Sequence, residues 1–195
     1  TPESGKIASF TIKFTFTAYE TLTSLDPAAV LPYDTASELY LQYTRPERFI
    51  ESDAPAIQAK AAGLAAGETN PLLLARKFYD YVIDSSRYEL KGEGLAGAQD
   101  LLTGGYGECG DYASLFVALS RASGIPARPI VGYWAVTGTD QTHVWAEFYL
   151  EGLGWVPVDP TIGQSDPAKR NYYFGSMDNQ RVILNKGFNL VMVPA

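Results

Sequence analysis

The chain has 195 residues, 46% of them hydrophobic and 13% aromatic, and it carries a formal net charge of −7 at pH 7. This length fits one ordinary domain with a substantial core, and the acidic balance excludes the clustered Lys and Arg of a nucleic-acid-binding surface. Because no apolar run approaches the roughly 18 residues that a spanning helix requires, we expect no transmembrane segment in this chain.

The N-terminal part, residues 1–50, predicts a β-containing lead-in, which is either a small appended segment or the tail of a larger β domain. The stretch from Phe10 to Ala18 alternates apolar and polar residues, a period typical of a half-buried strand. The chain starts abruptly at Thr1 without a signal-peptide pattern. If an export signal was removed upstream of Thr1, an extracytoplasmic location, periplasmic or at the cell surface, is favoured; otherwise the compartment stays open.

Two helices are predicted next. Asp53 is expected to cap a short Ala-rich helix ending near residue 67. Asn70 is expected to cap a second helix, with Pro71 at its first position. The apolar positions of the second helix recur every four residues, at Leu74, Phe78 and Val82.

A third helix is predicted from Cys109 to Ser123, directly after the Gly-rich turn at residues 104–107. Its apolar positions cover a broad face, so this helix is expected to be buried centrally. Gly124 suits a left-handed helix cap, and Pro126 prevents the helix from resuming. Four strand-like runs complete the chain, near 127–136, 142–150, 154–159 and 180–193.

Cys109 is the only cysteine, and His143 is the only histidine. One cysteine cannot form an internal disulfide, and this pair cannot build a usual structural zinc site, so we expect no metal and no cofactor. At a helix start, free N–H groups and the helix dipole stabilise a thiolate and can bind an oxyanion, while Gly110 leaves room for a substrate backbone. The alternative is that Cys109 is simply a small buried apolar side chain.

His143 lies in an alternating strand that turns near Gly152 and returns towards Asp159. In such a hairpin, residues whose numbers sum to about 302 to 304 face each other, so His143 faces a residue between 159 and 161. The apolar face leaves His143 and Asp159 on the same side. A cross-strand pair is close enough for a carboxylate to accept a proton from an imidazole nitrogen, and we predict a hydrogen bond between them.

Three ordered motifs resemble those of the transglutaminase-like superfamily. They are GECGDYASLFVAL at 107–119, HVWAE at 143–147 and GWVPVDPT at 154–161. The resemblance implies an α+β, papain-like transglutaminase core over residues 51–195, in which a central nucleophile helix packs on an antiparallel sheet. It also implies a triad of Cys109, His143 and Asp159 that performs acyl transfer through a thioester.

The resemblance leaves the reaction open. Water as the acceptor gives a protease or amidase acting on a protein or peptide substrate, which we favour, and a lysine amine gives protein cross-linking. A catalytically silent binding domain of the same fold is the third alternative. Animal transglutaminases are regulated by calcium, and no acidic loop here has a convincing ligand pattern.

The oxyanion and substrate residues are also open. Animal transglutaminases use a Trp upstream of the nucleophile, whereas every Trp of this chain lies downstream of Cys109. Tyr88, Gln99 or Tyr106 could donate the hydrogen bond instead, and Tyr88 ranks first by its motif position. Trp145 and Trp155 either wall a substrate groove or pack in the core.

Overall fold

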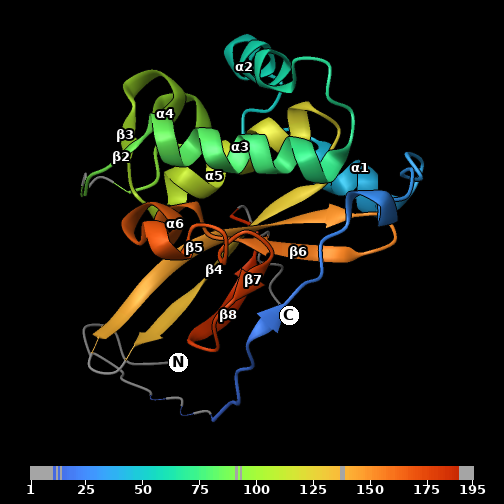
Figure 1. Cartoon of the computed structure of the whole chain (residues 1–195). Helices are drawn as coiled ribbons and strands as arrows, with labels where there is room; N and C mark the ends of the chain where they lie inside the picture. Colours follow the sequence, from blue (N-terminus) through green and yellow to red (C-terminus); the bar gives the residue numbers. More distant parts are fainter. Residues whose placement is uncertain are drawn as a thin grey trace, which may run out of the picture.

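The structure, a computed structural model, describes residues 11, 13, 15–90, 92, 94–136 and 139–188, without the side chains of residues 136, 139 and 140. Helices cover one face of an antiparallel sheet (Figure 1). The strands lie in the order β6-β5-β4-β8, with bounds β4 Ala127–Val136, β5 Thr139–Leu150, β6 Gly154–Val158 and β8 Arg181–Lys186. This arrangement confirms the predicted α+β, papain-like architecture.

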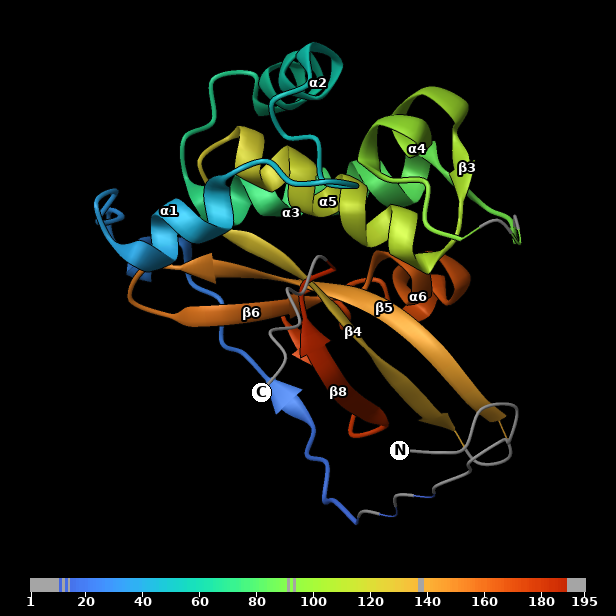
Figure 2. The same cartoon turned by 180° about the vertical axis from the view of Figure 1, so that it is seen from behind.

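The helical layer is built around the central helix α5, which packs on β4 and β5 and contacts α2, α3 and α4 (Figure 2). The longer helices are α2 Pro55–Ala65, α3 Pro71–Ser85 and α5 Cys109–Ala122. Shorter helices are α1 Glu38–Thr44, α4 Ala98–Gly104 and α6 Pro160–Ser165, with 3₁₀ turns at Pro27–Ala29 and Pro167–Lys169. Two short strand pairs complete the fold, β1 Thr21–Leu22 with β7 Ser176–Met177, and β2 Arg87–Tyr88 with β3 Tyr106–Gly107.

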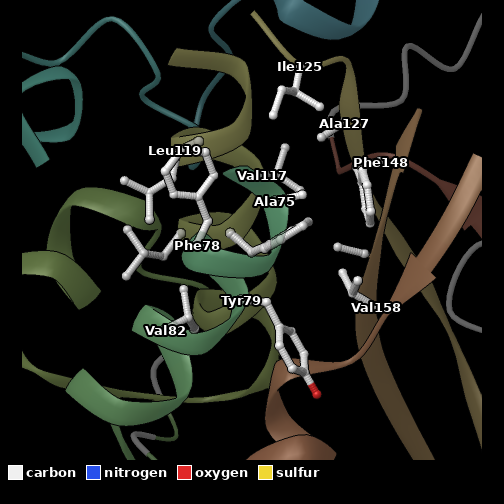
Figure 3. Packing of buried hydrophobic residues seen from close by; sticks show 14 of the residues in the cluster. Ala75, Phe78, Tyr79, Val82, Val117, Leu119, Ile125, Ala127, Phe148 and Val158 are labelled. Atoms are coloured by element: carbon white, nitrogen blue, oxygen red, sulfur yellow. The ribbon is translucent and has the colours of Figure 1, made fainter. Parts of the chain in front are cut away.

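The core forms where α3 and α5 press against the sheet, because α5 is apolar on nearly every side. Phe78 from α3, Val117 from α5 and Phe148 from β5 converge there (Figure 3), each with no exposed surface. Fully burying side chains of this kind contributes about 1.5–3 kcal/mol each. This packing fixes α5, and therefore its first residue, relative to the strands.

The helix signals in the sequence are confirmed with one correction. Asn70 caps α3, since its side-chain oxygen accepts from the N–H groups of Leu72 and Leu73 at 3.0 and 3.4 Å. The Asp53 cap was wrong: α2 begins one residue later, after Ala54, and Pro55 at its first position sets the helical φ instead. Gly124 has the left-handed φ of +73° expected after α5.

The strand predictions differ from the structure at the ends of the chain. Phe10, Ile12 and Phe14 lie outside the described residues, and the described residues between 11 and 18 form no strand. β8 ends at Lys186, so residues 187 and 188, which were predicted to belong to this strand, lie beyond its end. The rest of the predicted run, residues 189–193, lies outside the described residues. Helices α1, α4 and α6 were not predicted, and α1 lies in the segment that was expected to be a β-containing lead-in.

The β5–β6 hairpin has the predicted register. Ala146 pairs with Val158 and Leu150 pairs with Gly154, so paired numbers sum to 304. β6 ends at Val158, and the chain then turns into α6 with Asp159 as its N-cap. The position opposite His143 is therefore occupied by the start of a helix instead of a continuing strand.

Candidate active site

Cys109 is the first residue of α5, and a buried carboxylate fixes this helix start. Asp111 is fully buried; its Oδ2 accepts from the Glu108 N–H at 3.0 Å, and its Oδ1 accepts from the Ala96 and Gly97 N–H groups at 2.9 Å each. Hydrogen bonds that a carboxylate accepts are stronger than hydrogen bonds between neutral groups. The loop before α5 and the loop before α4 are thus joined beside Cys109.

Two backbone N–H groups at the start of α5 are available to bind a ligand. The first N–H groups of a helix have no partner inside it, and those of Cys109 and Gly110 meet no acceptor within the described part of the chain. Cys109 itself is partly exposed. An oxyanion that forms at this position in a substrate is therefore stabilised by the helix N-terminus.

His143 and Asp159 form the predicted hydrogen bond. The His143 Nε2 lies 2.7 Å from the Asp159 Oδ2, and both residues are buried, with 6% and 0% exposure. The other carboxylate oxygen, Oδ1, accepts from the Ile162 N–H at 3.1 Å as the N-cap of α6. Both oxygens of Asp159 are therefore engaged, which fixes the plane in which the imidazole is held.

The electrostatics of the site favour a charged imidazole. Burial lowers the pKa of His143, but the charge and hydrogen bond of Asp159 and the neighbouring Cys109 raise it, from 6.5 to about 9. Burial would likewise raise the pKa of Asp159, yet His143 and Arg181 hold it below its ordinary value. At neutral pH His143 is therefore protonated and Asp159 ionised, and the His143 Nε2–H donates to Asp159.

Cys109 is brought to the same imidazole. Cys109 and His143 line the same pocket, and the interaction of the imidazole with Cys109 contributes to the raised pKa of His143. Because Nε2 is engaged with Asp159, Nδ1 is the nitrogen left for the sulfur. The structure thus brings together the three residues that the sequence placed on separate elements: the start of α5, the middle of β5 and the end of β6.

Two pockets meet at Cys109, and both include Cys109 and Thr142 in their walls. The first, here called the Leu95 pocket, has a volume of about 310 Å³ and apolar walls from Leu95, Val131, Val144 and Phe188. The second, the Trp134 pocket, has a volume of about 410 Å³ and includes His143, Tyr88, Trp134, Thr161 and Gln164. Cys109 therefore lies between two mostly apolar pockets, and the acidic residues Glu108 and Asp111 line the first of them as well.

The oxyanion candidates do not all reach this position. Tyr88 lies in the wall of the Trp134 pocket, and burial, with the charges of Cys109 and Glu108, raises its pKa. Gln99 and Tyr106 line neither pocket: Gln99 is exposed near Glu51, and Tyr106 faces the space beside Glu89. Tyr88 is thus the candidate that the structure places beside the sulfur.

Of the two alternatives for the tryptophans, the structure favours packing. Trp145 is 2% exposed and stacks beside the His143 ring with centroids 6.1 Å apart, and Trp155 is covered by Arg128 at 3.7 Å from its ring centroid. Both line a different pocket, which includes neither Cys109 nor His143. Trp134, which the sequence did not single out, lies in the pocket of Cys109 with its ring 6.0 Å from that of His143.

Two absences hold for the part of the chain that the structure describes. Its described His, Cys, Asp and Glu side chains form no cluster of three or more that could hold a metal ion. Its described helices include none with the length and apolarity needed to cross a membrane.

Comparisons with known proteins agree with this geometry. Residues 58–160, which include Cys109, His143 and Asp159, match the family model of the transglutaminase-like superfamily. An uncharacterized protein of Haemophilus influenzae is 35% identical over 118 residues, 47% of this chain and 32% of that protein. A protein-glutamine gamma-glutamyltransferase of Pseudomonas aeruginosa is 34% identical over 65 residues, 28% of this chain and 10% of that protein. The chain thus spans a third or less of these curated relatives.

Solved structures share the fold. A candidate cysteine protease from Cytophaga hutchinsonii superposes with a TM-score of 0.59 at 22% identity, covering 85% of this chain and 63% of that one. The periplasmic domain of TgpA from Pseudomonas aeruginosa, bound to ethylmercury, gives a TM-score of 0.55 at 24% identity, covering 70% and 53%. At these identities the likeness shows the fold alone.

Proposed function

This chain belongs to the transglutaminase-like superfamily, and on that premise we propose that it is a cysteine-nucleophile enzyme that hydrolyses peptide or amide bonds through a thioester on Cys109. The observation that supports the proposal is the position of a single imidazole between two partners. His143 is 2.7 Å from a fully buried carboxylate, and it lines the same pocket as Cys109, the only thiol of the chain.

The first half of the reaction forms the thioester. The Cys109 sulfur attacks the carbonyl carbon, a C–S bond forms, and the carbonyl π electrons move to the oxygen. The N–H groups at the start of α5, with the Tyr88 hydroxyl beside them, stabilise that oxyanion. The C–N bond then breaks, and the leaving nitrogen takes the proton that His143 Nδ1 carries.

The second half returns the enzyme to its starting state. Water attacks the thioester while His143 takes its proton, the C–S bond breaks, and a carboxylic acid leaves. The released sulfur is again a thiolate beside an imidazolium. Asp159 stays ionised throughout and holds the ring, which is the role of the third residue in such triads.

The two pockets divide the substrate. His143 must reach the leaving nitrogen and the incoming water, so the Trp134 pocket, which His143 lines, holds the leaving group and then the acceptor. The acyl part of the substrate lies in the Leu95 pocket, where Leu95, Val144 and Phe188 suit an apolar side chain and the acidic Glu108 and Asp111 disfavour a negatively charged one. Protein or peptide chains with such a side chain before the cleaved bond are the substrates that this arrangement favours.

Glutamine transamidation is the second candidate. It is favoured by the likeness to a protein-glutamine gamma-glutamyltransferase and by the 410 Å³ pocket on the acceptor side, which has room for more than a water molecule. In this reaction an amine replaces water in the second half, and all bonds to the enzyme stay the same.

The test uses wild-type protein, Cys109→Ala and, as a matched control on the same helix, Ser114→Ala, whose buried hydroxyl makes no hydrogen bond in the described structure. Fluorescein-labelled casein reports hydrolysis, and a fluorescent amine reports transamidation into casein. The proposal predicts peptide release by wild type and Ser114→Ala and none by Cys109→Ala. Amine incorporation without peptide release would replace hydrolysis by the second candidate, and full activity of Cys109→Ala would overturn both.

A further inference from the structure

Arg181 is a buried cation that touches the site from the far side. It is the first residue of β8, and its side chain is 3% exposed. Its Nη2 lies 3.1 Å from the Asp159 Oδ2, the same oxygen that is 2.7 Å from the His143 Nε2. Asp159 is therefore shared between an imidazolium and a guanidinium.

The surroundings leave the guanidinium little freedom. Its central carbon lies 5.0 Å from the Trp134 ring centroid and 5.7 Å from each of the Trp145 and Tyr173 centroids, distances at which a cation is attracted to a ring face. Its Nε and Nη1 groups are buried and donate no hydrogen bond in the described structure, although Nε lies 3.5 Å from the Asp178 Oδ1, and Nη2 donates to the Asp178 Oδ2 at 3.5 Å. Burying a charged group without a full set of hydrogen bonds costs free energy, so we expect the guanidinium to have a role beyond packing.

The charged groups facing Arg181 are few. Asp159 faces it from the end of β6, and Asp178, before β8, lies 3.5 Å from its Nε and also accepts from the Tyr173 hydroxyl at 2.9 Å. Glu147 of β5 lines the same pocket as Arg181, but it is paired with Arg128 at 2.7 Å. His143 is reached only through Asp159.

Charges of opposite sign alternate from His143 through Asp159 to Arg181. An unopposed carboxylate in a fully buried place would either take up a proton or hold the imidazolium proton too tightly for transfer. A cation on its far side prevents both outcomes, because it favours the ionised carboxylate and weakens its pull on the ring proton.

From this geometry we propose that Arg181 is a positioning residue of the reaction, which keeps Asp159 ionised and aimed at His143 and sets how readily His143 releases its proton. This inference deepens the proposed function and rests on it. It predicts a direction: removing a positive charge favours the protonated form of every nearby group, so both titrations of the His143–Asp159 pair move to higher pH.

The experiment measures the rate of Cys109 alkylation by iodoacetamide against pH, together with the NMR titration of the His143 ring. Each signal is unambiguous, because the chain has one cysteine and one histidine. Arg181→Met should move the inflections to higher pH by about 1 unit, and Arg181→Lys, which keeps the charge, should restore them. Arg128→Met removes another buried arginine from the same sheet and should leave them in place.

A second variant guards against failure of Arg181→Met to fold. Asp178→Asn removes the other anion beside Arg181, so the effective positive charge on Asp159 grows and the inflections should move to lower pH. Unshifted inflections in both Asp178→Asn and a folded Arg181→Met would overturn the inference, as would a shift that Arg181→Lys fails to reverse. If wild-type Cys109 reacts no faster than a free cysteine at any pH, the proposed function itself fails, and this outcome is distinct from the others.

Discussion

Replacing Asp159 by Asn tests the charge that holds His143. The change keeps the shape of the side chain and removes its negative charge, so burial then lowers the pKa of the imidazole against the smaller, opposing effect of Cys109. The pKa of His143 should fall from about 9 to 6.5 or below. This difference corresponds to about 3 kcal/mol, at roughly 1.4 kcal/mol per pH unit.

The consequence for catalysis has two parts. At pH 7 the imidazolium fraction falls from about 99% to about a quarter, which alone lowers the rate about fourfold. Loss of the carboxylate that holds the tautomer and orientation of the ring adds to this, so peptide hydrolysis should fall at least about a hundredfold. The assay is the NMR titration of the single histidine, read beside the hydrolysis rate.

Stability must be controlled in this experiment, because Asp159→Asn leaves Arg181 buried with a weakened set of partners. Breaking a buried pair in this way costs about 3–5 kcal/mol. The double variant Asp159→Asn, Arg181→Met removes both charges and should recover part of the loss. A folded Asp159→Asn protein whose His143 still titrates near pH 9 would refute the electrostatic reasoning.

Two further predictions concern stability and the oxyanion. Because the pKa of His143 is raised on folding, its contribution to the free energy of unfolding is fully present below pH 6.5 and is lost as pH rises through about 9. The difference in unfolding free energy between wild type and His143→Gln, from urea titrations, should therefore shrink by up to about 3 kcal/mol between pH 6 and pH 10; a difference independent of pH would contradict this. Tyr88→Phe removes one oxyanion donor and should lower kcat about a hundredfold. Since Tyr88 is 44% exposed, the melting temperature should hardly change, and an unchanged kcat would exclude the hydroxyl from the reaction.

The sequence predicted the part of the site that depends on local geometry. The helix start at Cys109 followed from the Gly-rich turn and the apolar run after it. The contact of His143 with Asp159 followed from a short hairpin, in which strand period and turn position fix register and face together. Both depend on neighbours close in the chain, which is why residue spacing sufficed.

The unpredicted parts depend on contacts between distant segments. Arg181 reaches Asp159 because β8 pairs with β4, and nothing in the residues around 181 reports that pairing. Strand parity placed Trp145 on the side of His143, but the β8 backbone approaches Gly132 closely beside the Trp145 ring, so this ring is buried. Asp53 was a reasonable cap by residue type, yet Pro55 favoured a later start for α2.

The most direct test of the account is the formation of an acyl–enzyme. Wild type and His143→Gln are mixed with a p-nitrophenyl ester of an apolar amino acid, quenched in acid at successive times and weighed by intact-protein mass spectrometry. The account predicts one acyl group on Cys109 that forms at least about a hundredfold faster in wild type, as general acid–base assistance requires, and then turns over. Equal rates in the two proteins, or an acyl group on another residue, would contradict it.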